Sequence, residues 1–310
     1  MNVKQFIVGS SLILMSGISL IINISVLFVL IRHFLKHNSI YVLAITIISG
    51  NIVQVFLVFV YLGPTSLFQA DILPPIANKF FSFIFLALWY IDMAFILVMA
   101  LNRFLTVVYQ KEKFFTRTCC WVISAIIYSA GFVTAFCGDY VISCCTAYID
   151  YKVYSYTYLE PGYNYVNNYI DMPVNVTSSS VCSVPYITIF IYVRRVNKSN
   201  TAISYAVPNH RRKREVRYAL QFAACSVMAC VAWILFRILP VIIHPKAPYL
   251  RSLIVHFLIG HYTANSLIFI IFNAEFKRKF FRKSSVVSHV VSNTFKVQSE
   301  QNNCNLSATK

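Results

Sequence analysis

Seven stretches of the chain are almost wholly apolar, and short polar segments separate them. A helix needs about 20 consecutive apolar residues to cross the hydrocarbon core of a bilayer, and each stretch approaches or exceeds that length. The pattern therefore predicts seven membrane-spanning helices, at residues 6–31, 40–62, 80–108, 119–140, 174–193, 217–243 and 253–272. We expect the second helix to end at Gly63-Pro64 and the polar, tyrosine-rich segment 143–173 to lie outside the bilayer.

Composition agrees with a membrane protein and argues against a soluble globular or wholly disordered chain. Hydrophobic residues make up 58% of the 310 and charged residues only 12%, whereas an average soluble domain has about 25% charged residues. The net charge of +17 is unevenly placed, because 21 of the 27 Lys and Arg residues lie at the ends of the first, third and fifth stretches, in the segments after them, or in the tail. By the positive-inside rule, the N-terminus lies outside and the C-terminus in the cytoplasm. Attraction to anionic membrane lipids then explains the charge, and nucleic acid is not an expected partner.

No catalytic or metal-binding constellation appears in the sequence. The nine cysteines lack metal-ligand spacing, and the motifs of zinc proteases, serine hydrolases and P-loop nucleotide-binding proteins are missing. We therefore expect neither an enzyme nor a bound cofactor.

A set of polar residues inside or beside the apolar stretches carries a family resemblance. Asn23 lies in the first stretch, Asn51 in the second, Asn102-Arg103-Phe104 near the end of the third, and Asn265-Ser266-Leu267-Ile268-Phe269 in the seventh. An amphipathic segment, 272–280, follows. These positions and their spacing resemble the pattern of the rhodopsin-like G-protein-coupled receptors. The chain further resembles the nematode serpentine chemoreceptors, class X being the closest group. This resemblance lies in the triplet Asn102-Arg103-Phe104, the Gly63-Pro64 after the second stretch and the aromatic loop 144–169.

The resemblance implies an all-α membrane protein with a seven-helix bundle. Residues 1–283 would form this receptor domain, including a short interfacial helix, and residues 284–310 a disordered cytoplasmic tail. It further implies a chemosensory, olfaction-type receptor of the plasma membrane that transmits binding of an unknown small-molecule ligand to a heterotrimeric G protein. The alternative from another class is a seven-span ligand-gated channel or transporter, which should show a charged pore lining or paired broken helices.

Arg103 is the residue that we expect to act as the activation switch, together with Asn265 and Phe269. In the family, a carboxylate holds the corresponding arginine inward in the inactive state. Asn102 stands where the adjacent acid would be, so the lock must differ here. Glu215 is a candidate partner across the bundle, although a surface pair with a neighbouring arginine explains it equally well.

Asp92 lies eleven residues before Arg103, which is about 16 Å along a helix at roughly 1.5 Å per residue. A carboxylate this deep in a membrane is costly unless it is paired. We expect Asn23, Asn51, Asp92 and Arg237 to form an intramembrane polar network, with Arg237 as a second partner for Asp92. The resemblance implies a sodium site near Asp92, because Asp92 falls where the family usually has a small polar residue beside its sodium site. A protonated Asp92 satisfied by hydrogen bonds is the alternative.

The outer segments carry further candidates. The family's cysteine at the outer end of the third helix would fall near Asn78, where there is none, so Cys144 or Cys145 could pair with Cys182 instead. Asn175 opens a glycosylation sequon. The tyrosines between 148 and 169 would cover the mouth of a ligand cavity, or else form an interfacial aromatic belt.

Overall fold

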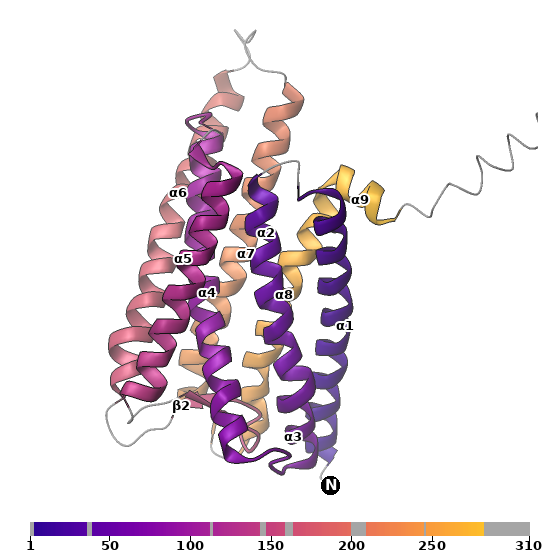
Figure 1. The fold of residues 1–310 in the computed structure, drawn as a ribbon, viewed down its shortest axis with the longest axis vertical. Coiled ribbons are helices and arrows are strands. Elements are labelled where there is room, and N and C mark those ends of the chain that lie inside the picture. The colour runs from indigo at the N-terminus through magenta and orange to yellow at the C-terminus, as the bar shows by residue number, and fades with distance from the viewer. Residues whose placement is uncertain are drawn as a thin grey trace, which may run out of the picture.

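The computed structural model describes residues 3–35, 39–111, 114–142, 147–158, 164–199, 209–244 and 246–281. It confirms an all-α bundle in which seven helices are long and apolar enough to cross a membrane. The tail predicted to be disordered, from residue 284 onward, lies outside the described residues. The N-terminus and the only strands of the described part lie at one end of the bundle, and helix α9 lies at the other end (Figure 1).

Seven helical segments make up the bundle, and three of them contain a π-helical turn. The bounds are α1 (Val3–His33), α2 (Ser39–Leu57) continued by a π turn (Val58–Leu62) into α3 (Gly63–Phe68), α4 (Pro75–Val107), α5 (Arg117–Phe136) with a π turn (Cys137–Val141), α6 (Met172–Ser199) preceded by a π turn (Asn167–Asp171), α7 (Asn209–Ile242) and α8 (Ser252–Phe272). A 3₁₀ turn (Pro248–Arg251) precedes α8, and a short helix, α9 (Ala274–Phe280), follows it.

The prediction that the second helix ends at Gly63-Pro64 is wrong. The π turn before α3 resets the hydrogen-bond register, so Pro64 falls in the first turn of α3. A proline is common in the first turn of a helix, because its fixed φ already suits the helical backbone. Gly63 is needed where α3 passes α1, because a Cβ at this position would lie 2.7 Å from Cγ1 of Ile13 on α1.

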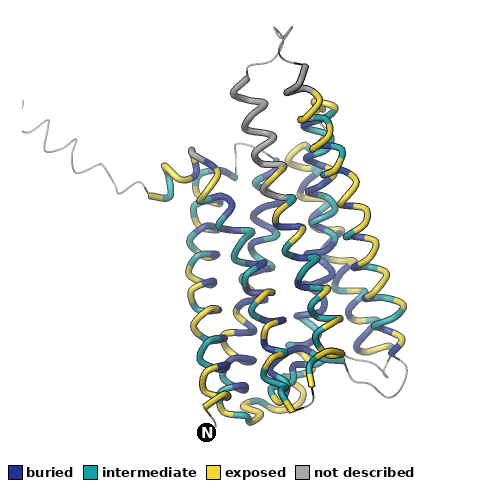
Figure 2. The backbone as a smooth tube through the Cα atoms, turned by 180° about the vertical axis from the view of Figure 1, so that it is seen from behind, coloured by how far each residue is buried: buried dark blue, intermediate teal, exposed yellow. Residues whose placement is uncertain are grey.

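Apolar side chains cover the outside of the bundle as well as its core. On α1, Leu14, Ile21 and Phe28 are at least 60% exposed, whereas Leu12, Val26 and Leu30 on the opposite face are fully buried. Exposed residues line the outer faces of the helices along most of their length (Figure 2). A helix that is apolar on all sides suits lipid around the bundle rather than water. Helix α4 is the most buried of the seven, and its neighbours are α2, α5, α6 and α7.

A β-hairpin closes the end of the bundle where the chain begins. Strands β1 (Ala147–Asp150) and β2 (Ser155–Tyr158) pair antiparallel, with Ala147 opposite Tyr158 and Asp150 opposite Ser155. Tyr154, just before β2, has a φ of 59°, which turns the chain back. The tyrosine-rich segment therefore contains a small folded unit that the apolar pattern did not predict.

Helix α9 turns away from the bundle axis at the end opposite the hairpin (Figure 1). The Asn273 side chain caps it by accepting a hydrogen bond from the Phe276 backbone N–H at 3.1 Å. Phe276 is fully buried and stacks on Phe34, the residue after α1, with ring centroids 5.6 Å apart. This aromatic contact and the basic residues of its last turn match the short interfacial helix expected from the sequence.

Candidate functional site

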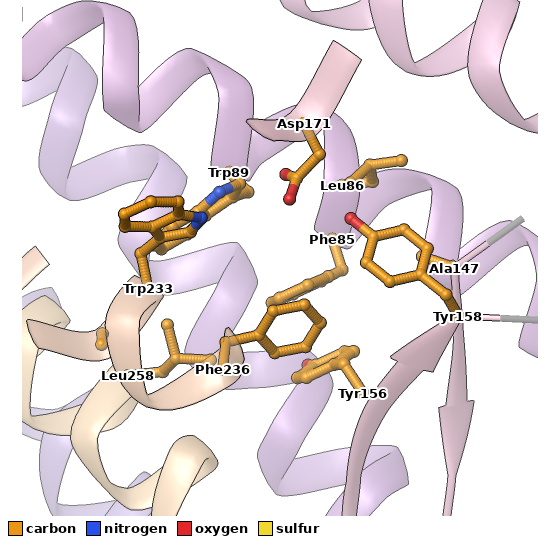
Figure 3. Close-up of a pocket in the computed structure, with 11 residues that line it drawn as sticks. Phe85, Leu86, Trp89, Ala147, Tyr156, Tyr158, Asp171, Trp233, Phe236 and Leu258 are labelled. Carbon is orange, nitrogen blue, oxygen red and sulfur yellow. The ribbon is translucent and has the colours of Figure 1, made fainter. Parts of the chain in front are cut away.

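A pocket of about 410 Å³, part of it open to solvent, lies between the hairpin and the ends of the helices. We call it the hairpin pocket (Figure 3). Its lining comes from α4, the hairpin, the start of the fifth span, α7 and α8: Phe85, Leu86, Trp89, Ala147, Tyr156, Tyr158, Asp171, Ala232, Trp233, Phe236 and Leu258. A concave, mostly aromatic surface with few polar groups is the usual form of a small-molecule site.

Aromatic contacts join the hairpin to the helices around this pocket. Tyr156 stacks on Phe85 of α4 with centroids 3.5 Å apart, and Tyr158 meets Phe236 of α7 edge to face at 5.8 Å. For Tyr156 and Tyr158, these contacts favour a cover over a cavity, since both side chains line the pocket. Tyr165 and Tyr169 of the same loop are more than half exposed, as the alternative of an aromatic belt predicts. Burial raises the pKa of both tyrosines above the usual range, and for Tyr158 the Asp171 carboxylate adds to the effect. Both hydroxyls therefore stay protonated.

Hydrogen bonds from α4 hold strand β1 in place. The Asn78 side-chain amide donates to the Ile149 carbonyl at 3.0 Å, and its oxygen accepts from the Ile149 N–H at 3.3 Å. The same N–H also donates to the Ser82 hydroxyl at 3.0 Å. Asn78 lies at the position where the family has its cysteine. In this protein, hydrogen bonds between the Asn78 side-chain amide and the Ile149 backbone connect α4 to the loop at this point.

Asp171 is the charged residue in the lining of the hairpin pocket, and Arg237 forms an ion pair with it. Arg237 Nη2 lies 3.1 Å from Asp171 Oδ2, and the Asp171 side chain is only 3% exposed. Arg237 also donates to the Asn167 carbonyl at 3.2 Å. The predicted role of Arg237 as a partner of Asp92 is therefore wrong. The π turn that begins the fifth span carries Asp171 into the bundle, whereas the sequence placed it in a loop.

Asp92 pairs with a residue that sequence reasoning missed. His261 Nε2 on α8 lies 2.7 Å from Asp92 Oδ2 on α4, and both residues are buried. The only signal for this histidine was an imidazole inside an apolar run, and a lone histidine there is often just packed. The two residues are 169 positions apart in the chain, so only the tertiary arrangement of the bundle brings them together.

A second pocket, the central pocket, adjoins this pair and has a volume of about 400 Å³. Its lining includes Asp92, Ser226 and Asn265, which carry oxygen atoms, and the buried Phe269. Among the described residues, no group of three or more His, Cys, Asp or Glu side chains could hold a metal ion. The oxygen-bearing lining could suit sodium, and the sodium site near Asp92 stays a prediction.

The predicted polar network is divided into separate contacts. The Asn23 amide donates to the Ser19 carbonyl at 2.8 Å, and its oxygen accepts from the Ser266 hydroxyl at 2.6 Å, which links α1 to α8. Asn51 is buried, and its amide nitrogen has no hydrogen-bond partner in the part of the chain that the structure describes. Asp92 and Arg237 each have other partners, so the four residues do not form one network.

Arg103 faces inward at the end of α4 that lies away from the hairpin. It is 4% exposed, and its Nη2 and Nε donate to the Asn102 side-chain oxygen at 2.7 and 3.2 Å. The side chain of Glu215 lies outside the described residues, so its predicted role stays a prediction. Phe269 lies near Tyr41 and Phe276, with ring centroids about 6 Å away, and it lines the central pocket beside Asn265.

Two predictions about the outer surface are wrong. Cys182 is a buried free thiol inside α6, where it donates to the Ser179 carbonyl at 3.3 Å; its predicted partners, Cys144 and Cys145, lie outside the described residues. Asn175 is fully buried, donates to Asp171 Oδ1 at 2.9 Å and accepts from Trp89 Nε1 at 3.0 Å. A glycan on this nitrogen would have no room. Both errors arise because the fifth span begins earlier than its apolar pattern indicated.

Seven spans, a covered pocket at one end and a buried arginine at the other characterise this bundle. The bundle is similar to the crystal structure of squid rhodopsin, with a TM-score of 0.73, 11% sequence identity, and coverage of 91% of this chain and 86% of that one. Likeness at this identity shows the fold alone. A family model described as the serpentine type seven-transmembrane GPCR chemoreceptor Srx matches residues 13–273. The chain belongs to this family, a multi-pass class of membrane receptors, which confirms the resemblance drawn from the sequence. A search of curated proteins gave no match.

Proposed function

We propose that this receptor detects a chemosensory small molecule and activates a heterotrimeric G protein. The observation that carries the proposal is the hairpin pocket, an aromatic cavity of about 410 Å³ at the opposite end of the bundle from Arg103. A ligand that binds one arrangement of the helices more tightly shifts the population toward it. Membership of a chemoreceptor family supports this reading.

The proposed orientation places the hairpin outside the plasma membrane and α9 on its cytoplasmic side. The distribution of Lys and Arg supports it, because most basic residues lie at the Arg103 end, which includes α9 with Lys277, Arg278 and Lys279. These cations, next to buried phenylalanines, suit contact with anionic lipid headgroups. A ligand would then reach the pocket from outside the cell.

We propose that Arg103 contacts the G protein, or that its movement opens the site where the G protein binds. Asn102 holds its guanidinium by two hydrogen bonds.

Signalling in cells with and without the G protein tests this function. Cells that express the receptor would be exposed to an odorant panel while second messengers and membrane current are recorded. We expect a second-messenger response that disappears without the G protein, and that Arg103→Ala abolishes at normal surface expression. A current that persists without the G protein would favour the channel alternative, and normal signalling by Arg103→Ala would refute the role of this residue.

A further inference from the structure

Some polar atoms around the hairpin pocket have hydrogen-bond partners within the protein and others have none among the described residues. This difference indicates which polar groups a ligand should carry. The Asp171 carboxylate is engaged on both oxygens. Oδ2 receives Arg237 at 3.1 Å, Oδ1 receives the Asn175 amide at 2.9 Å, and the Tyr158 hydroxyl also hydrogen-bonds to the carboxylate. The negative charge is thus compensated by protein, and little acceptor capacity faces the cavity.

Two donors of the lining are left without such a partner. In the part of the chain that the structure describes, Trp233 Nε1 and the Tyr156 hydroxyl are buried and have no hydrogen-bond partner. Tyr156 is 3% exposed, and both side chains line the pocket (Figure 3). An indole N–H can only donate. Trp89, by contrast, has its N–H occupied by the Asn175 side-chain oxygen at 3.0 Å.

The rest of the lining is apolar, so it disfavours a charged ligand. Phe85, Leu86, Phe236 and Leu258 provide carbon surface around the two donors. A ligand ammonium would have to displace Arg237 from Asp171 to find its counter-charge. A ligand carboxylate would enter next to an already neutralised pair, and burying an unpaired charge is costly. An oxygen acceptor on an uncharged molecule meets neither obstacle.

We propose that the hairpin pocket binds an uncharged, largely apolar molecule with a carbonyl or similar acceptor oxygen, which the Trp233 N–H recognises. Ketones, esters and aldehydes are the matching chemical class. The Tyr156 hydroxyl lies in the same pocket as a second donor, and the aromatic rings hold the apolar part. This inference rests on the proposed function, because it assumes that the hairpin pocket is where the ligand binds.

Binding of matched probes to the purified, full-length receptor in lipid nanodiscs tests the proposal. Acetophenone, ethylbenzene, α-methylbenzylamine and benzoate share one ring and differ in the polar group. A second set would hold aliphatic ketones and esters with the alkanes, amines and carboxylates of the same chain length. Affinity would be measured by ligand-induced thermal stabilisation, which does not require signalling.

We expect the carbonyl probes to bind about tenfold more tightly than the matching hydrocarbons, as a hydrogen bond to an otherwise unpaired buried donor implies. Trp233→Phe keeps an aromatic ring but removes the N–H, so it should reduce this preference to about onefold without changing hydrocarbon affinity. Tyr156→Phe would show whether the second donor contributes. Tightest binding by amines or carboxylates, a preference retained in Trp233→Phe, or no binding by any carbonyl probe would overturn the proposal.

Ala232→Leu separates this inference from the proposed function. Ala232 lines the pocket and is fully buried, so the added carbons should fill part of the cavity and weaken every probe that binds there. If amines bind best and Ala232→Leu blocks their binding, the hairpin pocket is the ligand site but the proposed ligand class is wrong. If bound probes do not respond to Ala232→Leu, the pocket itself is not the ligand site. The unfolding temperature of each variant without ligand controls for misfolding.

Discussion

Replacing His261 by leucine tests whether the pair between α4 and α8 holds the bundle together. The change removes the 2.7 Å contact to Asp92 and leaves this carboxylate, on a residue only 6% exposed, without its imidazole partner. Removing one partner of a buried hydrogen-bonded pair leaves the other polar group unsatisfied, which costs about 1–3 kcal/mol. Asp92→Asn replaces the carboxyl group but keeps a polar group beside His261, so its cost should be about 1–2 kcal/mol.

The double variant distinguishes a coupled pair from two independent residues. With Asn at position 92 there is no carboxylate for His261→Leu to leave unpaired, so the double variant should be more stable than the sum of the single changes predicts. We expect a coupling energy of about 1–3 kcal/mol, measured by thermal unfolding of the purified receptor in detergent. Single changes that add to within about 0.5 kcal/mol would refute the reasoning.

His256 provides a matched control on the same helix. Its ring contacts the Ser11 hydroxyl at 3.0 Å and the Ser252 carbonyl at 2.7 Å, and neither partner is charged. His256→Leu should therefore cost only about 1 kcal/mol and show no coupling to Asp92→Asn. If His256→Leu is as harmful as His261→Leu, loss of any histidine on α8 would explain the result.

Two more predictions compare variants that differ in one physical respect. Asn175→Ala should destabilise the receptor by about 1–3 kcal/mol because it leaves the buried indole N–H of Trp89 unpaired. Thr177→Ala removes the same sequon at an exposed position and should leave stability unchanged. Glycosidase treatment should not shift the electrophoretic band of the wild-type receptor. Gly9→Ala would place a Cβ 2.6 Å from the backbone of α3 and should sharply reduce surface expression, whereas Gly260→Ala meets nothing closer than 3.9 Å and should be tolerated. Equal loss of expression in the two glycine variants would contradict the proposed contact of α1 with α3.

The spans could be predicted because lipid allows few alternatives. A backbone inside a bilayer must satisfy its own hydrogen bonds, so a long apolar run is almost certain to be helical. The exceptions were at helix ends. Pro64 and the polar residues before Met172 suggested a stop, but π turns continued both helices.

The candidate site was harder to predict because its pairs come from different helices. Arg103 was singled out by its position along one helix, and it does lie inward beside Asn102. Asp171 and His261 were missed as partners, since their roles depend on which helix faces which. A resemblance to a family supplies the order of the helices but not the rotation of each one at this level of divergence.

Asn78 has a consequence for how long a ligand would stay bound. At Ile149 the hairpin is tied to α4 by hydrogen bonds: the carbonyl accepts from the Asn78 amide, and the N–H is shared between the Asn78 oxygen and the Ser82 hydroxyl. A typical hydrogen bond contributes about 0.5–1.5 kcal/mol net. Ties of this strength separate thermally, whereas a covalent link at the same point would not. A cover held in this way suits short residence times and rapid recovery between stimuli. Its closure at this point would also be insensitive to thiol reductants.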